Sequence, residues 1–196
     1  MNAKRVVRVW DIPVRLFHWW LVVAFFIAYF TEDDWMVVHV WAGYSVLSLV
    51  LFRILWGFVG TRYARFSNFI CSPRTAFAYL KAVFLMHPKR YLGHNPAGAM
   101  MIVLLLASLL ITTITGVIAY GADEGAGPLA GIVTSYGDVW EDVHELCANF
   151  TLFLVFLHLL GVAFESFLHR ENLVKSMIDG NKRLDESADG SRDEAT

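Results

Sequence analysis

The sequence predicts an all-α integral membrane protein: a four-helix bundle with the N and C termini cytoplasmic and a short interfacial helix between helices two and three. Three observations carry this prediction. Of the 196 residues, 57% are hydrophobic and only 17% are charged, whereas soluble domains have about 25% charged residues. The apolar residues gather in long runs, and the charges alternate in sign between the loops that separate the runs. We expect one membrane domain over residues 1–183 and a disordered polar tail over residues 184–196.

Four apolar runs are suited to crossing a bilayer as helices. The runs cover residues 16–30, 35–60, 97–120 and 143–168. A hydrocarbon core of about 30 Å takes roughly 20 helical residues. The first run is the shortest and reaches the usual range when it is extended to residues 14–31. No small-residue cleavage site follows it, so we interpret it as a membrane anchor rather than a signal peptide.

The loops alternate in charge. The N-terminal segment, the stretch 60–96 and the segment after residue 168 contain four, six and five bases, and the stretch 60–96 contains no acid. The loops after the first and third runs contain acids and no base: Glu32, Asp33, Asp34, Asp123, Glu124, Asp138, Glu141 and Asp142. Because positively charged loops stay in the cytoplasm, both termini are predicted to be cytoplasmic and both acidic loops to face outward.

The stretch between the second and third runs contains a helix signal of its own. Ser72 is suited to cap a helix that starts at Pro73. Phe77, Leu80 and Phe84 then recur at spacings of three and four. This pattern predicts a short helix at the membrane interface, with its basic residues toward the lipid headgroups.

Two further boundaries follow from the same signals. Asn95 and Pro96 repeat the cap-then-proline pattern at the start of the third run. Gly180 is suited to end a short cytoplasmic helix that begins near Arg170.

Four of the seven histidines lie in the apolar runs, where ionisable residues are costly and mark functional sites. The predicted topology places His18 near the inner surface and His39 near the outer surface. His144 and His158 share the last run, fourteen residues apart, which on a helix is ~21 Å along the axis and about 40° around it. One helix therefore offers one imidazole per leaflet, and two pairs result: His18 with His158, and His39 with His144.

Two imidazoles that face each other across a helix bundle suit the two axial positions of a haem iron. We therefore expect two haems. The sequence has no Cys-x-x-Cys-His, so covalent attachment is not expected. A proton relay or a zinc site remains an alternative, although neither pair has an obvious third and fourth ligand for zinc.

Four other residues in the runs have two interpretations each. Gly43, Gly116 and Gly161 either let a macrocycle approach the backbone or serve close helix packing. Arg53 either pairs with a propionate of the inner haem or extends toward the headgroups.

The remaining aromatic and histidine side chains have plainer interpretations. The seven tryptophans near the run ends are typical of an interfacial belt. His87, His94 and His169 fall outside the runs or just past their ends and are expected in loops. For His94, in "GHNP", a role in handling quinone protons is the alternative.

Several stretches together resemble one family. They are "VRVWDIPVRLFHWWLV", "HVWAGY", "FRILWGFVGTRYARFSNF", "GHNPAGAMM", "EDVHELCANF" and "HRENLVKSMIDGNKR". Over residues 5–183 the chain resembles the prokaryotic di-haem cytochrome b family, which includes Ni,Fe-hydrogenase cytochrome b subunits and bacterial cytochromes b-five-sixty-one. The resemblance implies a four-helix cytochrome of the bacterial inner membrane with two b-type haems ligated by His18, His39, His144 and His158.

The same resemblance implies electron transfer between the quinone pool and a redox partner. The partner is expected to be a periplasmic c-type cytochrome or an extrinsic oxidoreductase subunit, and the compact chain looks more like stand-alone members that serve c-type cytochromes. The alternatives are a hydrogenase cytochrome b subunit and a quinone-linked oxidoreductase that acts on a small diffusible reductant. A transporter with a histidine proton relay and a passive membrane anchor are further alternatives. We expect lipid contact and no nucleic-acid partner.

Overall fold

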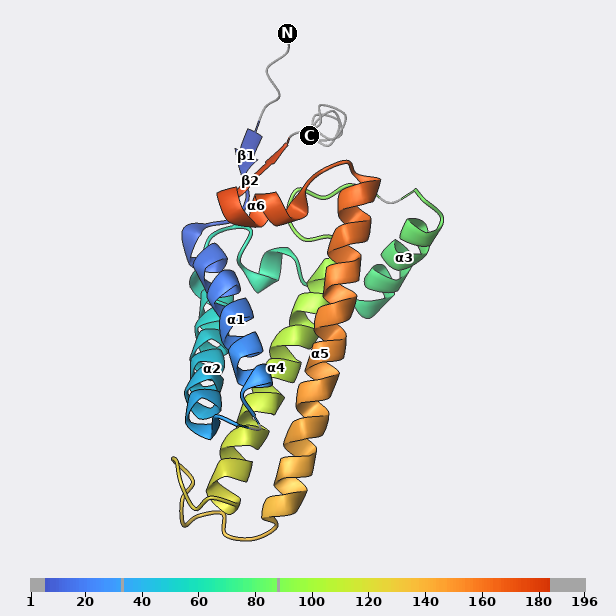
Figure 1. Ribbon diagram of the computed structural model, residues 1–196. Coiled ribbons are helices and arrows are strands. Elements are labelled where there is room, and N and C mark those ends of the chain that lie inside the picture. The colour runs from blue at the N-terminus through green and yellow to red at the C-terminus, as the bar shows by residue number, and fades with distance from the viewer. Residues whose placement is uncertain (1–5, 33, 88, 184–196) are drawn as a thin grey trace. The chain divides into compact units, whose positions relative to one another are not determined.

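The computed structural model describes residues 6–32, 34–87 and 89–183 (Figure 1). The elements in chain order are β1 (Val6–Arg8), α1 (Ile12–Phe30), α2 (Met36–Val59), the 3-10 helix η1 (Phe66–Asn68), α3 (Pro73–Phe84), α4 (Pro96–Ala122), α5 (Gly137–Leu168), α6 (Leu173–Asp179) and β2 (Asn181–Arg183). The helical fold class is confirmed, with one two-stranded sheet that the sequence pattern did not predict. The predicted polar tail lies outside the described residues.

Four of these helices, α1, α2, α4 and α5, are long and apolar enough to cross a membrane. Between 11% and 33% of the most apolar stretch of each is buried inside the protein. Leu16, Phe30, Leu55 and Phe167 are among the large apolar side chains that remain exposed. An apolar surface this extensive suits lipid rather than water, so the four predicted membrane helices are confirmed.

The start of α5 differs from the prediction. The helix begins at Gly137, six residues before the apolar run at 143, so Asp138, Glu141 and Asp142 lie on its first turns rather than in a loop. Carboxylates are favourable at a helix N-terminus because they face the positive end of the helix dipole. The acids therefore mark where the apolar run begins, whereas the helix begins before them.

The chain divides into two compact units. The first unit comprises residues 1–16, 56–100 and 158–196, and the second comprises residues 17–55 and 101–157.

In the first unit, β1 pairs antiparallel with β2, with Val6 opposite Arg183. Gly180 caps α6 in the left-handed conformation (φ 85°), and its carbonyl accepts from the backbone N–H of Val9 (2.8 Å) and Trp10 (3.1 Å). The C-terminal segment is thus tied to the start of the chain. The predicted short helix ending at Gly180 is confirmed, although it begins at Leu173.

Asp11 joins the start of α1 to the end of α2, also within the first unit. One carboxylate oxygen caps α1 by accepting from the backbone N–H of Val14 (2.8 Å). The other accepts from Trp56 Nε1 (3.0 Å) and from the Thr61 hydroxyl (2.6 Å). The Trp56 indole therefore has a hydrogen-bond partner inside the protein, and its place in a headgroup belt stays a prediction.

The "WGFVG" stretch at the end of α2 needs its first glycine for packing. A Cβ on Gly57 would overlap the ring of Phe66 in η1. Only glycine lets this part of α2 and η1 approach so closely.

Helix α3 begins as predicted. Ser72 Oγ accepts from the backbone N–H of Thr75 (3.2 Å), and Pro73 is the first helical residue. Tyr79 and Val83 are buried, whereas the predicted apolar stripe of Phe77, Leu80 and Phe84 is exposed. The helix is confirmed, and its place at the membrane interface stays a prediction.

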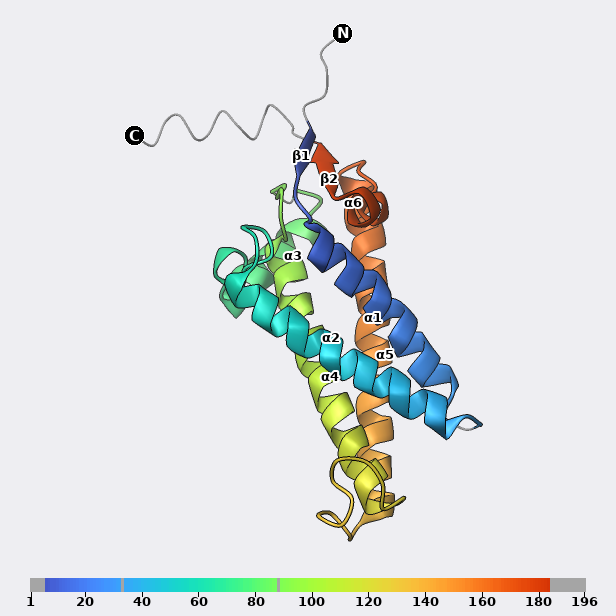
Figure 2. The same ribbon diagram turned by 90° about the vertical axis from the view of Figure 1, so that its left-hand side faces the viewer.

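In the second unit, α4 and α5 run side by side in both views (Figures 1 and 2). Buried hydroxyls join them: Thr151 Oγ1 lies 2.6 Å from Ser108 Oγ and 3.0 Å from Thr112 Oγ1. Thr151 is fully buried and its hydroxyl also donates to the Cys147 carbonyl (2.8 Å). These bonds satisfy polar groups that would otherwise be costly in an apolar interior.

Candidate functional site

The second unit brings together two of the four membrane histidines. The rings of His39 on α2 and His144 on α5 have centroids 5.9 Å apart and planes at 89°. A metal–imidazole bond is roughly 2 Å long, so imidazoles on opposite sides of one iron have ring centres roughly 6 Å apart. The observed separation therefore fits one metal ion between the two rings.

Both rings are held by their Nδ1 atoms. His39 Nδ1 lies 2.8 Å from the Ala28 carbonyl of α1, and His144 Nδ1 lies 2.9 Å from the Thr112 carbonyl of α4. A carbonyl only accepts, so each Nδ1 carries the proton and donates it. In each ring Nε2 is then the atom with a lone pair for a metal.

Glycines shape the surroundings of this pair. A Cβ on Gly116 would lie 2.7 Å from Cε1 of His144, so Gly116 accommodates the imidazole itself. A Cβ on Gly43 would meet no atom within 4 Å, and this open face suits the approach of a flat macrocycle. The residues present fit a haem with His39 and His144 as axial ligands.

The other two histidines belong to different units, His18 to the second and His158 to the first. Each is half-buried. The His18 ring lies edge-on to that of Trp19, with centroids 5.1 Å apart. A Cβ on Gly161, three residues after His158, would meet no atom within 4 Å. The pairing of His18 with His158 stays a prediction.

Arg53 on α2 is only 3% exposed. The guanidinium is therefore covered by protein, and both interpretations of Arg53 stay predictions. A buried cation needs compensating anionic or hydrogen-bonding groups.

The first unit contains an ionic cluster that the sequence pattern did not reveal. Glu171 accepts from Arg90 Nη2 (3.0 Å) and from the backbone N–H of Arg183 (3.0 Å). Burial alone would raise the pKa of Glu171, but these two hydrogen bonds and the charges of Arg90 and Lys182 lower it overall. Burial lowers the pKa of Lys182, and the negative charge of Glu171 opposes this shift in part.

A second set of polar contacts lies on α3 and the end of α5. The Tyr79 hydroxyl donates to Glu165 Oε1 (2.8 Å), and Glu165 Oε2 lies 3.1 Å from Nε2 of His169. Burial raises the pKa of Tyr79, as do its hydrogen bond to Glu165 and the charge of that carboxylate. The contacts of Tyr79 with Glu165 and of Arg90 with Glu171 join residues more than 80 positions apart, so no local pattern could have indicated them.

His94 is packed between aromatic rings in the first unit. Its ring centroid lies 4.5 Å from that of Trp10 and 4.6 Å from that of Phe69. Its neighbour Asn95 caps α4 by accepting from the backbone N–H of Gly98 (2.7 Å), as predicted. His94 is therefore part of the packing under this cap.

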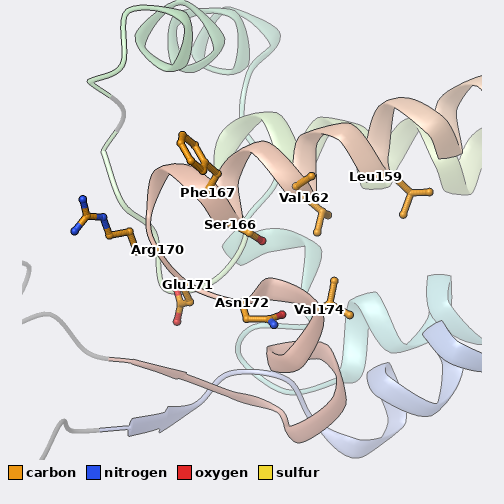
Figure 3. A pocket seen from close by; sticks show the side chains of 9 residues that line it. Leu159, Val162, Ser166, Phe167, Arg170, Glu171, Asn172 and Val174 are labelled. Atoms are coloured by element: carbon orange, nitrogen blue, oxygen red, sulfur yellow. The ribbon is translucent and has the colours of Figure 1, made fainter.

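An open groove lies between the end of α5 and α6 in the first unit (Figure 3). Leu159 and Val162 of α5 and Val174 of α6 point into the space between the two helices. Arg170 and Glu171 stand at the end of the groove, where the chain passes from one helix to the other. The groove lining is mostly apolar, with Ser166 and Asn172 among the lining residues and charged side chains at one end.

A family described as prokaryotic cytochrome b561 matches residues 9–180 of the chain. Three curated relatives share the name "Probable Ni/Fe-hydrogenase B-type cytochrome subunit". The protein of Azotobacter chroococcum mcd 1 is 26% identical over 92% of this chain and 90% of its own length. That of Rhizobium leguminosarum bv. viciae is 27% identical over 95% and 92%. That of Rhodobacter capsulatus is 29% identical over 93% and 83%. No solved structure shows significant similarity to the chain.

Proposed function

The chain belongs to the prokaryotic cytochrome b561 family, and on that premise we propose that it carries electrons across the bilayer through two b-type haems, one in each leaflet. The family membership and the four membrane helices make it a membrane b-type cytochrome of electron transfer. Two haems divide an insulating core of about 30 Å into shorter transfers. When bound, each haem supplies one-electron chemistry, and the protein sets its potential through ligation, hydrogen bonds and burial.

The observation that carries the proposal is the His39–His144 pair. The rings are 5.9 Å apart, and each donates its Nδ1 proton to a backbone carbonyl. This arrangement fixes both the tautomer and the ring orientation, as it does for metal-bound histidines in general. His39 and His144 are the proposed axial ligands of the outer haem, with Gly43 beside the macrocycle.

The inner haem is assigned to His18 and His158, with Gly161 beside it. Support comes from the predicted depth of the two residues and from the resemblance of their sequence contexts to the family. Arg53, which is buried, is the proposed partner of a haem propionate, because a carboxylate at that depth needs a cation.

The proposed direction of insertion places both termini in the cytoplasm of a bacterial inner membrane. It follows from the bases of the first unit and the acids of the second. The quinone is proposed to enter at the α5–α6 groove, whose apolar walls and polar end match the tail and head of a quinone. The outer partner is proposed to be a periplasmic c-type cytochrome.

A second candidate is a cytochrome b subunit of a Ni,Fe-hydrogenase. The names of the three curated relatives favour it. Its extrinsic partner would then be the hydrogenase itself. Reduction of the haems by hydrogen in membranes with and without a Ni,Fe-hydrogenase separates the two candidates.

The test of the two-haem proposal is a haem count. We expect a pyridine haemochrome assay on the purified protein to give about two b haems per chain, falling to about one in His39→Ala and in His18→Ala. His87→Ala, at an exposed position in the loop after α3, is the matched control and keeps two. One haem or none in the wild type, or a count indifferent to His39 and His18, would overturn the proposal.

A further inference from the structure

The carbonyl that orients His144 also accepts from a second side chain. The Thr112 carbonyl lies 2.9 Å from His144 Nδ1 and 2.9 Å from the hydroxyl of Thr115. The same hydroxyl lies 3.0 Å from the Ile111 carbonyl. Thr112 and Thr115 are buried, so water does not compete for these bonds.

The distances decide how Thr115 acts on His144. Thr115 Oγ1 is 3.4 Å from His144 Nδ1, which is longer than the usual range for a hydrogen bond. Its 2.9 Å contact with the Thr112 carbonyl lies within that range. The hydroxyl proton is shared between the carbonyls of Thr112 (2.9 Å) and Ile111 (3.0 Å). Thr115 therefore acts on His144 by donating in part to the carbonyl that His144 uses, rather than by accepting from the imidazole.

A carbonyl shared by two donors is a weaker acceptor for each of them. A strong bond from Nδ1–H makes an imidazole a more basic ligand, which favours the oxidised metal. Second-shell hydrogen bonding is one of the means by which a protein sets the potential of a haem.

We propose that Thr115 is a positioning residue that weakens the His144 hydrogen bond to the Thr112 carbonyl and so raises the reduction potential of the outer haem. The inference rests on the proposed function, because it takes His144 as an axial ligand.

The opposite ligand provides an internal comparison. His39 donates to the Ala28 carbonyl (2.8 Å), and Thr31 follows Ala28 by three residues, as Thr115 follows Thr112. The Thr31 hydroxyl, however, donates to the Ile27 carbonyl at 2.7 Å and lies 3.4 Å from that of Ala28. The Ala28 carbonyl also accepts from the backbone N–H of Thr31 (3.3 Å), but only on the His144 side does a hydroxyl share the acceptor at normal hydrogen-bond length. Thr31→Val is therefore expected to have little effect on the potential.

The experiment is a redox titration of the purified two-haem protein, followed by visible absorbance. The outer haem is identified as the component that His39→Ala removes. Thr115→Val is expected to lower the midpoint potential of the outer haem by about 30 to 60 mV. For one electron this is a roughly threefold to tenfold change in the reduction equilibrium constant. The inner haem is expected to be unchanged.

Two variants control for the loss of a buried hydroxyl. Thr115→Ser keeps the donor and is expected to match the wild type. Thr113→Val removes a buried hydroxyl on the same helix that donates to the Leu109 carbonyl (2.9 Å), and it is expected to leave both potentials unchanged.

An unchanged or raised outer potential in a Thr115→Val protein with two haems overturns the inference and leaves the proposed function intact. If Thr115→Val fails to bind the outer haem, Thr115→Cys takes its place, because a thiol is a weaker donor. A smaller downward shift then supports the inference, and no shift overturns it. A wild type without two haems instead contradicts the proposed function.

Discussion

Backbone carbonyls, rather than side chains, orient His39 and His144. Ala28 and Thr112 accept from His39 and His144 inside α1 and α4, at positions where each carbonyl is already part of a helix. A histidine held in this way keeps its acceptor whatever side chain the accepting residue has. The orientation instead depends on the small residues that let each ring reach the neighbouring helix.

Gly116 is the residue on which this approach most depends. A methyl group there would lie 2.7 Å from Cε1 of His144, and the ring could move away only by weakening its bond to Thr112. We expect Gly116→Ala to lose the outer haem from at least half of the molecules and to keep the inner one. Haemochrome content together with redox titration measures both.

Gly161→Ala is the comparison for this prediction. Its added methyl meets no protein atom within 4 Å, and Gly161 lies beside the proposed inner haem. We expect Gly161→Ala to keep the wild-type occupancy of the outer haem. Full outer occupancy in Gly116→Ala would show that the His144 ring does not need its present position.

The Glu171 cluster makes a pH-dependent contribution to stability. The pKa of Glu171 is lowered in the folded protein, so its contribution is fully present above the unfolded value of about 4.3 and is lost as the pH falls through the folded value. Glu171→Gln should cost about 1.5–3 kcal/mol at pH 7, because hydrogen bonds to a charged group are lost. The difference from wild type should disappear in acid.

Thermal unfolding in detergent micelles between pH 7 and the acid range measures this difference. Glu124→Gln, at an exposed position, is the control and should unfold like the wild type at every pH. A Glu171→Gln midpoint equal to that of wild type at pH 7 would show that the cluster adds nothing to stability.

At the scale of elements, the sequence predicted what local patterns determine. Length and apolar content located α1, α2, α4 and α5, and cap residues located the starts of α3 and α4. The β1–β2 pair was missed because it joins residues more than 170 positions apart, and three-residue strands have no periodicity to recognise. The contacts of Trp56 with Asp11 and of His144 with Thr112 were missed for the same reason.

Gly180 holds the missed strand pair in place. It adopts a φ of 85°, and a Cβ there would lie 2.7 Å from the Trp10 carbonyl oxygen. We expect Gly180→Ala to destabilise this tie by about 1–2 kcal/mol, the usual cost of the left-handed conformation. Trypsin should then cleave after Lys182 and Arg183 several times faster, as followed by mass spectrometry of the cut ends.

Two substitutions bracket this prediction. Gly180→Asn should fall between wild type and Gly180→Ala, because asparagine tolerates the left-handed conformation better. Asn181→Ala changes an exposed side chain in β2 and should cleave at the wild-type rate. Equal cleavage in all four proteins would mean that the tie does not protect the C-terminal segment.

The α5–α6 groove makes a prediction about quinone access. Ala163 lines the groove, so Ala163→Trp should fill it and slow haem reduction by a quinol at least fivefold while the haem count stays at two. Phe164→Trp places the same ring at a neighbouring position that does not line the groove and is the control. Stopped-flow absorbance in proteoliposomes measures the rate. Equal rates in both variants would show that the quinone does not enter at this groove.

At the scale of the whole molecule, the basic residues separate between the two units, whereas the acidic residues occur in both. The bases belong to the first unit except for Arg53, which is buried. The second unit contains exposed acids at Glu32, Asp34, Asp123, Glu124, Asp138, Glu141 and Asp142. This separation supports the proposed insertion, and in that orientation the outer surface would have a negative potential that would attract a basic partner.

The docking of a basic c-type cytochrome should therefore depend on these acids and on salt. We expect Asp138→Asn, Glu141→Gln and Asp142→Asn together to slow electron exchange about tenfold at low ionic strength, because steering acts on the association rate. The difference should vanish at about 1 M salt, where the screening length falls to about 3 Å.

Arg74→Gln with Lys81→Gln, on the exposed face of α3, is the matched control and should leave the rate unchanged. Stopped-flow mixing across a salt series measures all three proteins. A rate that changes neither with the acid substitutions nor with the salt concentration would argue against a soluble basic partner. It would favour a permanently attached extrinsic subunit, which is the arrangement that the hydrogenase alternative requires.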